Sequence, residues 1–300
     1  MKDDVRCFVE IVRQGSYAAA SKELGVSAAT LTRRITGLEE RLGVRLLDRT
    51  PRLCRPTADG EVFYERCEAI LDDMGAAEEE MRVRGGRPVG RLRVAAPISF
   101  GRRHLAPLIG EFHSLHPEVQ VELELTDETD LLRQESYDVS VEIGRPDRGD
   151  TISRLLLESP RVVCASPGYL ERHGRPERPA DLLEHRCLHL IRDGRRLDHW
   201  MFQVDGVVET VASKGYLASN SGDVLHEWAL AGRGIGLKAH WDIEEALTSG
   251  ALVPLLEDFA VERADVFVLY ADRRHLPNRV RAFLDFLYER MGPLDLERRP

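Results

Sequence analysis

The chain has 300 residues, a formal net charge of −9, 43% hydrophobic residues and 31% charged residues. This composition excludes a disordered protein, and the length suffices for two domains with a sizeable core. No apolar run reaches the roughly 20 residues of a membrane span, so we expect a soluble, cytoplasmic protein with no membrane partner.

An amphipathic helix is predicted at the N-terminus, where MKDDVRCFVEIVRQ places Val5, Phe8, Val9 and Val12 on one face. The stretch lacks the composition of a signal peptide, because charged residues interrupt every apolar run in it. It is therefore interpreted as the first structural element.

Two short helices joined by a three-residue turn are predicted in SYAAASKELGVSAATLTRRI, residues 16–35. Ser16 and Ser27 are good N-caps, and Gly25 can adopt the left-handed conformation that ends a helix. Val26 would fill the corner between the helices. The apolar spacing predicts buried faces made of Ala18, Ala19 and Leu24 in the first helix and Leu31, Ile35, Leu38 and Leu42 in the second. This layout is that of a helix-turn-helix, whose second helix lies in the DNA major groove.

A wing is predicted beside the second helix, because VRLLDRTPRLCRPT has the pattern of two short strands around a turn at Thr50–Arg52. Residues 27–57 contain seven arginines and three acidic residues, which gives this segment a net charge of +4. A small basic module on an acidic body is expected for a protein that contacts phosphate at one place only.

A long helix is predicted after Thr57, which would cap it, with Asp59 and Glu61 in the first turn. Alternating spacings of four and three residues form a heptad seam of Phe63, Cys67, Ile70, Met74, Ala77 and Met81. The seam could pack on its own domain. We expect it to pair with a second copy of the chain, because so long a helix outruns so small a domain. The GGRPVG of residues 85–90 predicts a linker.

From Arg91 onward, strands and helices are predicted to alternate. RLRVAAP, VQVELEL, DVSVEIG, RVVCASP, GIGLKA, VPLL and VFVLYA have strand patterns, with Glu122 and Glu124 facing outward. Helices are predicted at about 100–115, after Pro167, at about 223–231 and at about 277–289. This alternation is typical of α/β units with parallel sheets.

Taken together, these blocks resemble the LysR-type transcriptional regulators. GSYAAASKELGVSAATLTRRITGLEERLGVRLLDRT is similar to the family's helix-turn-helix, and PTADGE to the start of its linker helix. APISFGRRHLAPLIGEFHSLHPEVQVEL, DVSVEIG, LAGRGIGL and RRHLPNRVRAFLDFL resemble further family blocks, so the resemblance covers essentially the whole chain. It implies an α/β regulatory body like a type 2 periplasmic binding protein, with two lobes around a ligand cleft.

The resemblance implies three parts: a winged helix-turn-helix at 1–57, a dimerising linker helix and hinge at 58–90, and an effector-binding domain at 91–300. Lobe I would span about 91–163 and 267–300, and lobe II about 164–266. The implied partners are double-stranded promoter DNA with an interrupted palindrome, a small anionic effector such as a carboxylate, further copies of the chain in a dimer or tetramer, and RNA polymerase. No cofactor is expected.

The exposed N-terminal part of the second helix should read bases. The candidates are Ser27, Ala28, Ala29, Thr30, Thr32, Arg33 and Arg34. Where the family has Gln or Pro after the capping Ser, this chain has Ala28 and Ala29, so more of the readout falls on Thr30, Thr32 and Arg33. Wing residues Arg52 and Arg55 are placed to enter a minor groove, and Arg49 and Thr50 to contact phosphate. Taken alone, each arginine could equally be a solvated surface charge.

Effector binding is expected where helix N-termini follow strands, since these positions attract a carboxylate. Two such junctions are PISFG at 97–101, with Ser99 and Phe100, and SNSG at 219–222, with Asn220 and Ser221. Plain helix capping would favour the same residue types. Weaker candidates are Glu142, Arg145, Trp200, Phe202 and Lys238. Lys238, which stands where the family usually has an apolar residue, could counter an anion or reach solvent.

Several other patterns are discounted. GRGIG at 232–236 lacks the spacing of a dinucleotide fingerprint and precedes a strand. His185, Cys187 and His189 alternate along one strand and cannot easily converge on one tetrahedral metal ion. Five scattered cysteines argue against disulfides, although a redox switch of Cys164 with Cys187 stays open.

The chain shows no catalytic constellation, so we expect a regulator and not an enzyme. The alternatives are an enzyme with an appended DNA-binding domain, or a constitutive DNA binder that uses the α/β body only for oligomerisation. A response of promoter binding to a small molecule would separate the regulator from both.

Overall fold

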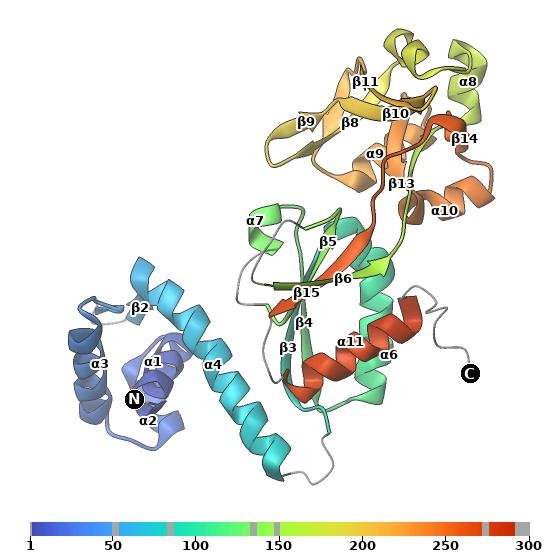
Figure 1. Ribbon diagram of the computed structural model, residues 1–300. Coiled ribbons are helices and arrows are strands. Elements are labelled where there is room, and N and C mark those ends of the chain that lie inside the picture. The colour runs from blue at the N-terminus through green and yellow to red at the C-terminus, as the bar shows by residue number, and fades with distance from the viewer. Residues whose placement is uncertain are drawn as a thin grey trace. The chain divides into compact units, whose positions relative to one another are not determined.

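The structure is a computed structural model that describes residues 2–49, 54–82, 87–132, 137–146, 151–271 and 276–291. The chain divides into two compact units, Met1–Arg91 and Leu92–Pro300 (Figure 1). No helix in the part of the chain that the structure describes combines the length and the apolar character needed to cross a membrane.

The first unit begins with three helices, α1 (Lys2–Gln14), α2 (Tyr17–Leu24) and α3 (Ala28–Leu42). Both predicted N-caps are confirmed: the Ala19 amide donates to Ser16 Oγ at 3.2 Å, and the Thr30 amide donates to Ser27 Oγ at 3.1 Å. Gly25 ends α2 with φ of 64°, a conformation that costs glycine little. These local signals place α2 and α3 as a helix-turn-helix.

The core of this unit differs from the predicted faces in two places. In α2 the fully buried residue is Ala20, with Tyr17 and Leu24 packed on the same cluster, so the buried face is shifted by one position from Ala18 and Ala19. Tyr17, Ala20 and Leu24 keep the helical spacing of three and four. In α3, Leu31, Ile35 and Leu38 are buried as predicted, whereas Leu42 is 41% exposed. The last turn of α3 extends beyond the cluster that covers the other three leucine and isoleucine side chains.

Two short antiparallel strands follow, β1 (Leu47–Arg49) and β2 (Cys54–Pro56), as the wing prediction requires. The predicted turn at Thr50–Arg52 lies outside the described residues. The long helix α4 (Ala58–Arg82) begins after Thr57, whose Oγ1 accepts a hydrogen bond from the Gly60 amide at 3.0 Å. The predicted cap and long helix are therefore confirmed.

The second unit contains two mixed sheets. The first lobe is built on the sheet β4-β3-β5-β15-β6, with β3 (Gly90–Ala96), β4 (Val119–Leu125), β5 (Val139–Ile143), β6 (Thr151–Leu157) and β15 (Val266–Ala271). The second lobe is built on β12-β8-β13-β7-β14, with β7 (Arg161–Ala165), β8 (Cys187–Arg192), β12 (Leu217–Ser219), β13 (Ile235–Ala239) and β14 (Val253–Leu255), and β9 (Arg195–Leu197) pairs with β8.

The expectation of parallel sheets is wrong in part. β3 runs parallel to β5, and β8 runs parallel to β12 and β13, but β15 is antiparallel to β5 and β6, and β7 is antiparallel to β13 and β14. The chain crosses from the first lobe to the second at residues 158–160 and returns at 261–265. Because the two crossing segments run in opposite directions, the strands that follow them enter each sheet antiparallel.

Helices cover both sheets. The first lobe has a continuous helical segment at 98–115, formed by α5 (Ile98–Phe100), a π-helical turn (Gly101–Leu105) and α6 (Ala106–Leu115), together with α7 (Thr129–Leu132) and the last helix α11 (Asn278–Met291). Phe112 of α6 and Phe283 of α11 form an edge-on pair with ring centroids 5.1 Å apart in the core. The second lobe has α8 (Pro167–His173), α9 (Gly222–Leu230) and α10 (His240–Thr248).

A hairpin of β10 (His199–Val204) and β11 (Val207–Ala212) also belongs to the second lobe, and sequence inspection missed it together with β6, β9, α7 and α10. Asp205 and Gly206, at its turn, both have positive φ, and so do Asp193 and Gly194 between β8 and β9. Asp-Gly is a strong signal for such two-residue turns. These two hairpins could therefore have been predicted.

Candidate functional site

The N-terminal part of α3 presents an exposed polar surface. Ala28, Ala29, Thr32 and Arg33 are exposed, and Ser27 Oγ lies 2.9 Å from Thr30 Oγ1. Thr32 Oγ1 donates to the Ala28 carbonyl at 2.9 Å, so its hydroxyl is partly engaged within the helix. Arg33 makes no ion pair with any residue in the described ranges, which leaves its guanidinium available to a ligand outside the chain.

The other basic candidates differ in their surroundings. Arg34 lies 3.4 Å from Asp3 and 3.9 Å from the Cys7 sulfur, so it connects α3 to α1. Arg55 is exposed on β2. The side chain of Arg49 and the whole of Thr50 and Arg52 lie outside the described residues.

The predicted seam of α4 is divided between two environments. Phe63 packs its ring 5.4 Å from that of Phe8, and Cys67 is buried in the same core, where burial raises the pKa of its thiol to about 11. The expectation that these two residues pair with a second copy is wrong, because the first turns of α4 lie on α1. Ile70 and Met74 are 56% and 39% exposed. The side chains of Ala77 and Met81 lie outside the described ones.

In the second unit, a cavity of about 80 Å³ lies between the two lobes. Pro97, Ser99 and Asp127 line it from the first lobe, and Asn220, Gly222 and Lys238 from the second. β8, β12 and β13 end at this cavity with their carboxyl ends, where α/β proteins bind ligands. The two junctions singled out in the sequence therefore meet at one cavity.

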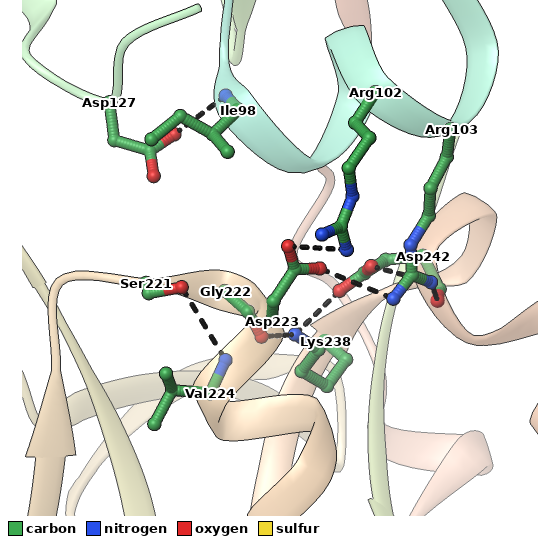
Figure 2. A network of polar contacts seen from close by, with 10 residues as sticks. All are labelled: Ile98, Arg102, Arg103, Asp127, Ser221, Gly222, Asp223, Val224, Lys238 and Asp242. Atoms are coloured by element: carbon green, nitrogen blue, oxygen red, sulfur yellow. Dashed lines mark hydrogen bonds and ion pairs between the residues drawn. The ribbon is translucent and has the colours of Figure 1, made fainter.

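Ser99 and Ser221 have different roles at these junctions. Ser221 Oγ accepts a hydrogen bond from the Val224 amide at 3.4 Å, so this serine is a helix cap, and it does not line the cavity (Figure 2). Ser99 caps nothing, because it follows Ile98 inside the first helical turn and Pro97 is the N-cap residue. The capping explanation therefore holds for Ser221 and fails for Ser99.

Lys238 does not reach solvent; it and Asp242 are each 5% exposed. Its Nζ lies 2.5 Å from Asp242 Oδ2 and donates to the Gly222 carbonyl at 2.7 Å. These contacts fix the ammonium beside the first turn of α9.

Two arginines of the first lobe reach across to this pair (Figure 2). Arg103 lies 3.1 Å from Asp242 Oδ1 and 3.2 Å from Asp223 Oδ1, and Arg102 lies 2.7 Å from Asp223 Oδ2. We call Arg102, Arg103, Asp223, Lys238 and Asp242 the interlobe network. Sequence inspection missed both arginines, since no spacing connects them with carboxylates 120 or more residues away.

Further ionisable groups border this region. Burial raises the pKa of Asp127, although its Oδ1 accepts a hydrogen bond from the Ile98 amide at 3.1 Å. Burial also lowers the pKa of His226, a residue of α9 close to Asp242. Both groups are therefore harder to ionise than in water.

Several predicted effector residues do not line the cavity. Phe100 is fully buried and packs edge-on against Trp241 with ring centroids 5.2 Å apart. Glu142 is buried on β5, and Arg145 lies at a different cavity beside Arg263 and Phe267.

Trp200 and Phe202 were assigned to the cleft, and the structure corrects this. Both are buried in the core of the second lobe. They alternate with exposed residues along β10, so the same face of the strand carries both into that core.

Comparisons with known proteins agree with this architecture. The family model "Bacterial regulatory helix-turn-helix protein, lysR family" matches residues 3–61, and "LysR substrate binding domain" matches residues 85–292. The chain belongs to the LysR-type transcriptional regulators.

Relatives extend over nearly the full length of this LysR-type regulator. It is 33% identical over 285 residues to the HTH-type transcriptional regulator DmlR of Escherichia coli, with 95% of this chain and 92% of DmlR covered. It is 33% identical over 298 residues to the activator TtdR of E. coli, covering 97% and 95%. The solved structure of CrgA, a LysR-type regulator of Neisseria meningitidis, matches with a TM-score of 0.63 and 29% identity, over 97% of this chain and 99% of CrgA.

The family assignment makes this chain a transcriptional regulator with a helix-turn-helix for DNA and an effector-binding domain. LysR-type regulators bind DNA and small-molecule effectors and are oligomeric. Its relatives are transcriptional regulators, which are not enzymes, and the alternatives of an appended enzyme or a constitutive binder are not favoured.

Two cysteines and two histidines singled out in the sequence have structural surroundings. Cys164 and Cys187 pack in different clusters on opposite faces of one sheet, and burial raises the pKa of each thiol to about 12, so a redox pair is excluded. His185 Nδ1 lies 3.2 Å from the Tyr169 hydroxyl, and His189 Nε2 lies 2.8 Å from Ser213 Oγ. In the described ranges no group of three acidic, histidine or cysteine side chains could hold a metal ion.

Proposed function

We propose that this LysR-type regulator responds to a small anion, such as a carboxylate, bound in the cavity between its lobes. One observation carries the proposal: Lys238 lines the cavity with an ammonium that has three donors, of which Gly222 and Asp242 take two. Ser99 and Asn220 add polar groups, and α9 begins at Gly222, where the first amides of a helix have no acceptor within the helix.

Binding there would act through the lobes. An anion held by Ser99 and Lys238 contacts both lobes, so it favours the arrangement in which they are close together. We propose that this arrangement alters how regulatory domains of neighbouring copies pack and thereby how the protein binds its promoter. The cytoplasm, where bacterial DNA lies, is the proposed location, and RNA polymerase a further partner.

For DNA, we propose that α3 reads bases through Arg33, Thr30 and Thr32, with Ser27, Ala28 and Ala29 close to the groove. Arg34, Arg49, Thr50, Arg52 and Arg55 would position the module on the backbone or in the minor groove. The support is the exposure of the α3 N-terminal surface and the lack of an ion pair at Arg33 within the described residues.

We also propose the division into residues 1–57, 58–90 and 91–300. The second part would pair two copies through the exposed residues of α4, Ile70 and Met74. That pairing would place two helix-turn-helices on the two halves of one operator.

The first test titrates the purified chain against its own upstream intergenic DNA and against random DNA, at two salt concentrations. We expect tight, sequence-dependent binding, with a footprint that a small carboxylate alters. Binding that is equal on both DNAs and abolished by modest salt would contradict the proposal, since it would reduce the contact to phosphate attraction.

Arg33→Ala tests the base-reading assignment. A bidentate arginine–guanine contact is worth about 1–3 kcal/mol of discrimination, so binding to the operator should weaken roughly 5- to 150-fold while random DNA is little affected. Arg34→Ala is the comparison variant, because Arg34 pairs with Asp3 and is proposed as a backbone contact, so its loss should weaken binding to operator and random DNA alike. Equal losses on both DNAs would make Arg33 a phosphate contact.

A further inference from the structure

Two more cations line the interlobe cavity, Arg161 at the start of β7 and Arg192 at the end of β8. The nearest carboxylate to the Arg161 guanidinium is that of Glu262, 3.8 Å away, and Glu262 Oε1 already accepts the Met201 amide at 2.8 Å. Arg192 makes neither an ion pair nor a hydrogen bond with its side chain to any residue that the structure describes. The cavity therefore has two guanidinium groups with little compensation.

The electrostatics of Arg161 reflect this excess. Burial lowers the pKa of Arg161, Glu262 opposes that effect, and the nearby positive charge of Arg192 adds to it. Like charges beside a small cavity are unfavourable, and an anion that accepts hydrogen bonds from both guanidiniums would relieve the repulsion.

Of the two arginines, Arg161 lies on the face of the sheet opposite to Lys238. Lys238 pairs across the sheet with Val162, so Arg161, one residue away, points to the opposite face. Gly236 pairs with Leu188 of β8, so Arg192, four residues further along β8, points to the same face as Lys238. The cavity thus covers the end of the second-lobe sheet, with Lys238 and Arg192 on one face and Arg161 on the other.

The acidic groups of the cavity compensate the arginines only in part: burial raises the pKa of Asp127, and the nearby charge of Arg192 opposes that effect. Asp242 is held by Lys238 and Arg103. Asp127 accepts the Ile98 amide and, within the described residues, forms no ion pair with Arg161 or Arg192. The cavity therefore offers two arginine cations at the end of the sheet in addition to Lys238.

We infer that the effector is a short dianion, a dicarboxylate whose one carboxylate binds at Lys238 and Ser99 and whose other binds between Arg161 and Arg192. This inference rests on the proposed function. It adds that the arginines select a second acidic group, and a cavity of about 80 Å³ requires a short chain between the two groups.

Calorimetry on the full-length protein tests this with defined probes. Malonate, succinate and glutarate are titrated at constant ionic strength, and each is compared with its monomethyl ester, which loses one charge and adds one methyl group. We expect at least one diacid to bind ten times or more tightly than its ester, which corresponds to about 1.4 kcal/mol.

Variants assign that difference to the arginines. In Arg192→Gln and Arg161→Gln the diacid should fall to the affinity of the ester, while the affinity for the ester stays within about twofold. Arg233→Gln, an exposed arginine of the same lobe away from the cavity, should change neither. If Arg161→Gln does not fold, Arg192→Gln and Arg161→Lys carry the test, the lysine keeping the charge and most of the preference.

Diacids that bind no more tightly than their esters would overturn the inference, and so would a preference that survives in both glutamine variants. If monocarboxylates bind and alter the DNA footprint while a second carboxylate adds nothing, only this inference is wrong. If no acid of the series binds or alters the footprint, the proposed anionic effector fails as well.

Discussion

Asp242 is the residue on which the interlobe network depends, because it compensates two cations, Lys238 and Arg103. Asp242→Asn would leave both cations short of a counter-charge, and breaking a buried pair in this way costs about 3–5 kcal/mol. Lys238→Met is the matched control, since it removes one cation, keeps the volume and leaves Asp242 with Arg103. The free energy of unfolding should fall much more in the first variant than in the second.

Urea unfolding followed by tryptophan fluorescence measures this difference. Trp200, Trp228 and Trp241 are the three tryptophans of the chain, and all lie in the second unit. The signal therefore reports on the effector-binding domain alone. Similar losses in Asp242→Asn and Lys238→Met would show that Arg103 does not stabilise Asp242.

Three buried histidines should make the stability of the second unit depend on pH. Burial lowers the pKa of His104, His189 and His226 in the folded protein. Below the unfolded value of about 6.5, the unfolded chain binds protons that the folded chain does not. The stability of the second unit should therefore be highest above pH 6.5 and fall as the pH decreases toward 5.

The unfolding midpoint between pH 7.5 and 5 checks this expectation. His189→Gln keeps a donor for Ser213 Oγ and removes one titrating group, so its midpoint should depend less on pH than that of the unaltered protein. A midpoint that is constant or rises on acidification would contradict the assignment of these residues as neutral in the folded state.

Sequence predicts residues best where the partner is local. Ser16, Ser27 and Thr57 each accept a hydrogen bond from the backbone amide three residues further on, and all three caps were predicted from residue type and position. Arg103 contacts Asp242, 139 residues further along the chain, and only the folding of both lobes brings them together. The partner of Lys238 is only four residues away, but this pair was not predicted because Asp242 lies in the first turn of α10, a helix that the sequence pattern did not indicate.

At the scale of elements, α4 combines two roles along one seam. Its first turns bury Phe63 and Cys67 on α1, whereas Ile70 and Met74, in the following turns, expose apolar surface. Isolated apolar residues are common on surfaces, but two on one heptad seam fit pairing with a second helix.

Ile70→Asp tests this pairing. A carboxylate on an apolar helix interface must lose its hydration, so the variant should dissociate to monomers at concentrations where the unaltered protein is a dimer. Analytical ultracentrifugation measures the change. Leu183→Asp is the control, because Leu183 is an apolar residue of the second lobe that is 40% exposed and does not belong to the α4 seam. Dissociation in both variants, or in neither, would contradict pairing through α4.

Elements with a strong period or a turn signature were recognisable, and short ones were not. The strand patterns of β4, β13 and β15 and the helical segment 98–115 were found near their observed bounds. α10 (His240–Thr248) was missed because it follows β13 almost directly, with no capping residue at Ala239 to mark its start. The antiparallel strands β7 and β15 could not be distinguished from parallel ones, since direction depends on where the chain crosses between lobes.

At the scale of the whole effector-binding domain, the cavity exists because two separately built sheets end at the same place. The sequence located both of its serine-containing junctions, but it could not show that Ser99 is free of capping and Ser221 is not. Phe100, Trp200 and Phe202 are buried in the cores of the lobes. The sequence pattern could not show this, because hydrophobic residues beside a cleft and inside a lobe have the same spacing.

Contacts between the two lobes should change the affinity for the effector, although neither lobe needs them in order to fold. The carboxylate of Asp223 on α9 forms ion pairs with Arg102 and Arg103 of the first lobe, and its side chain is only 21% exposed. Asp223→Asn keeps the shape and weakens both pairs. Because apparent affinity falls with the fraction of molecules in the binding-competent arrangement, a loss of about 1 kcal/mol between the lobes weakens effector binding roughly fivefold.

Calorimetry with whichever carboxylate binds the unaltered protein most tightly measures that loss, and Glu227→Gln on the same helix is the matched control. Glu227 is exposed and makes no contact with the first lobe in the described structure, so its neutralisation should leave the affinity unchanged. Added salt should reduce the gap between Asp223→Asn and the unaltered protein, because salt screens partly exposed pairs. An unchanged affinity in Asp223→Asn, with an unchanged unfolding midpoint, would mean that the interlobe network does not govern closure and that the effector alone holds the lobes together.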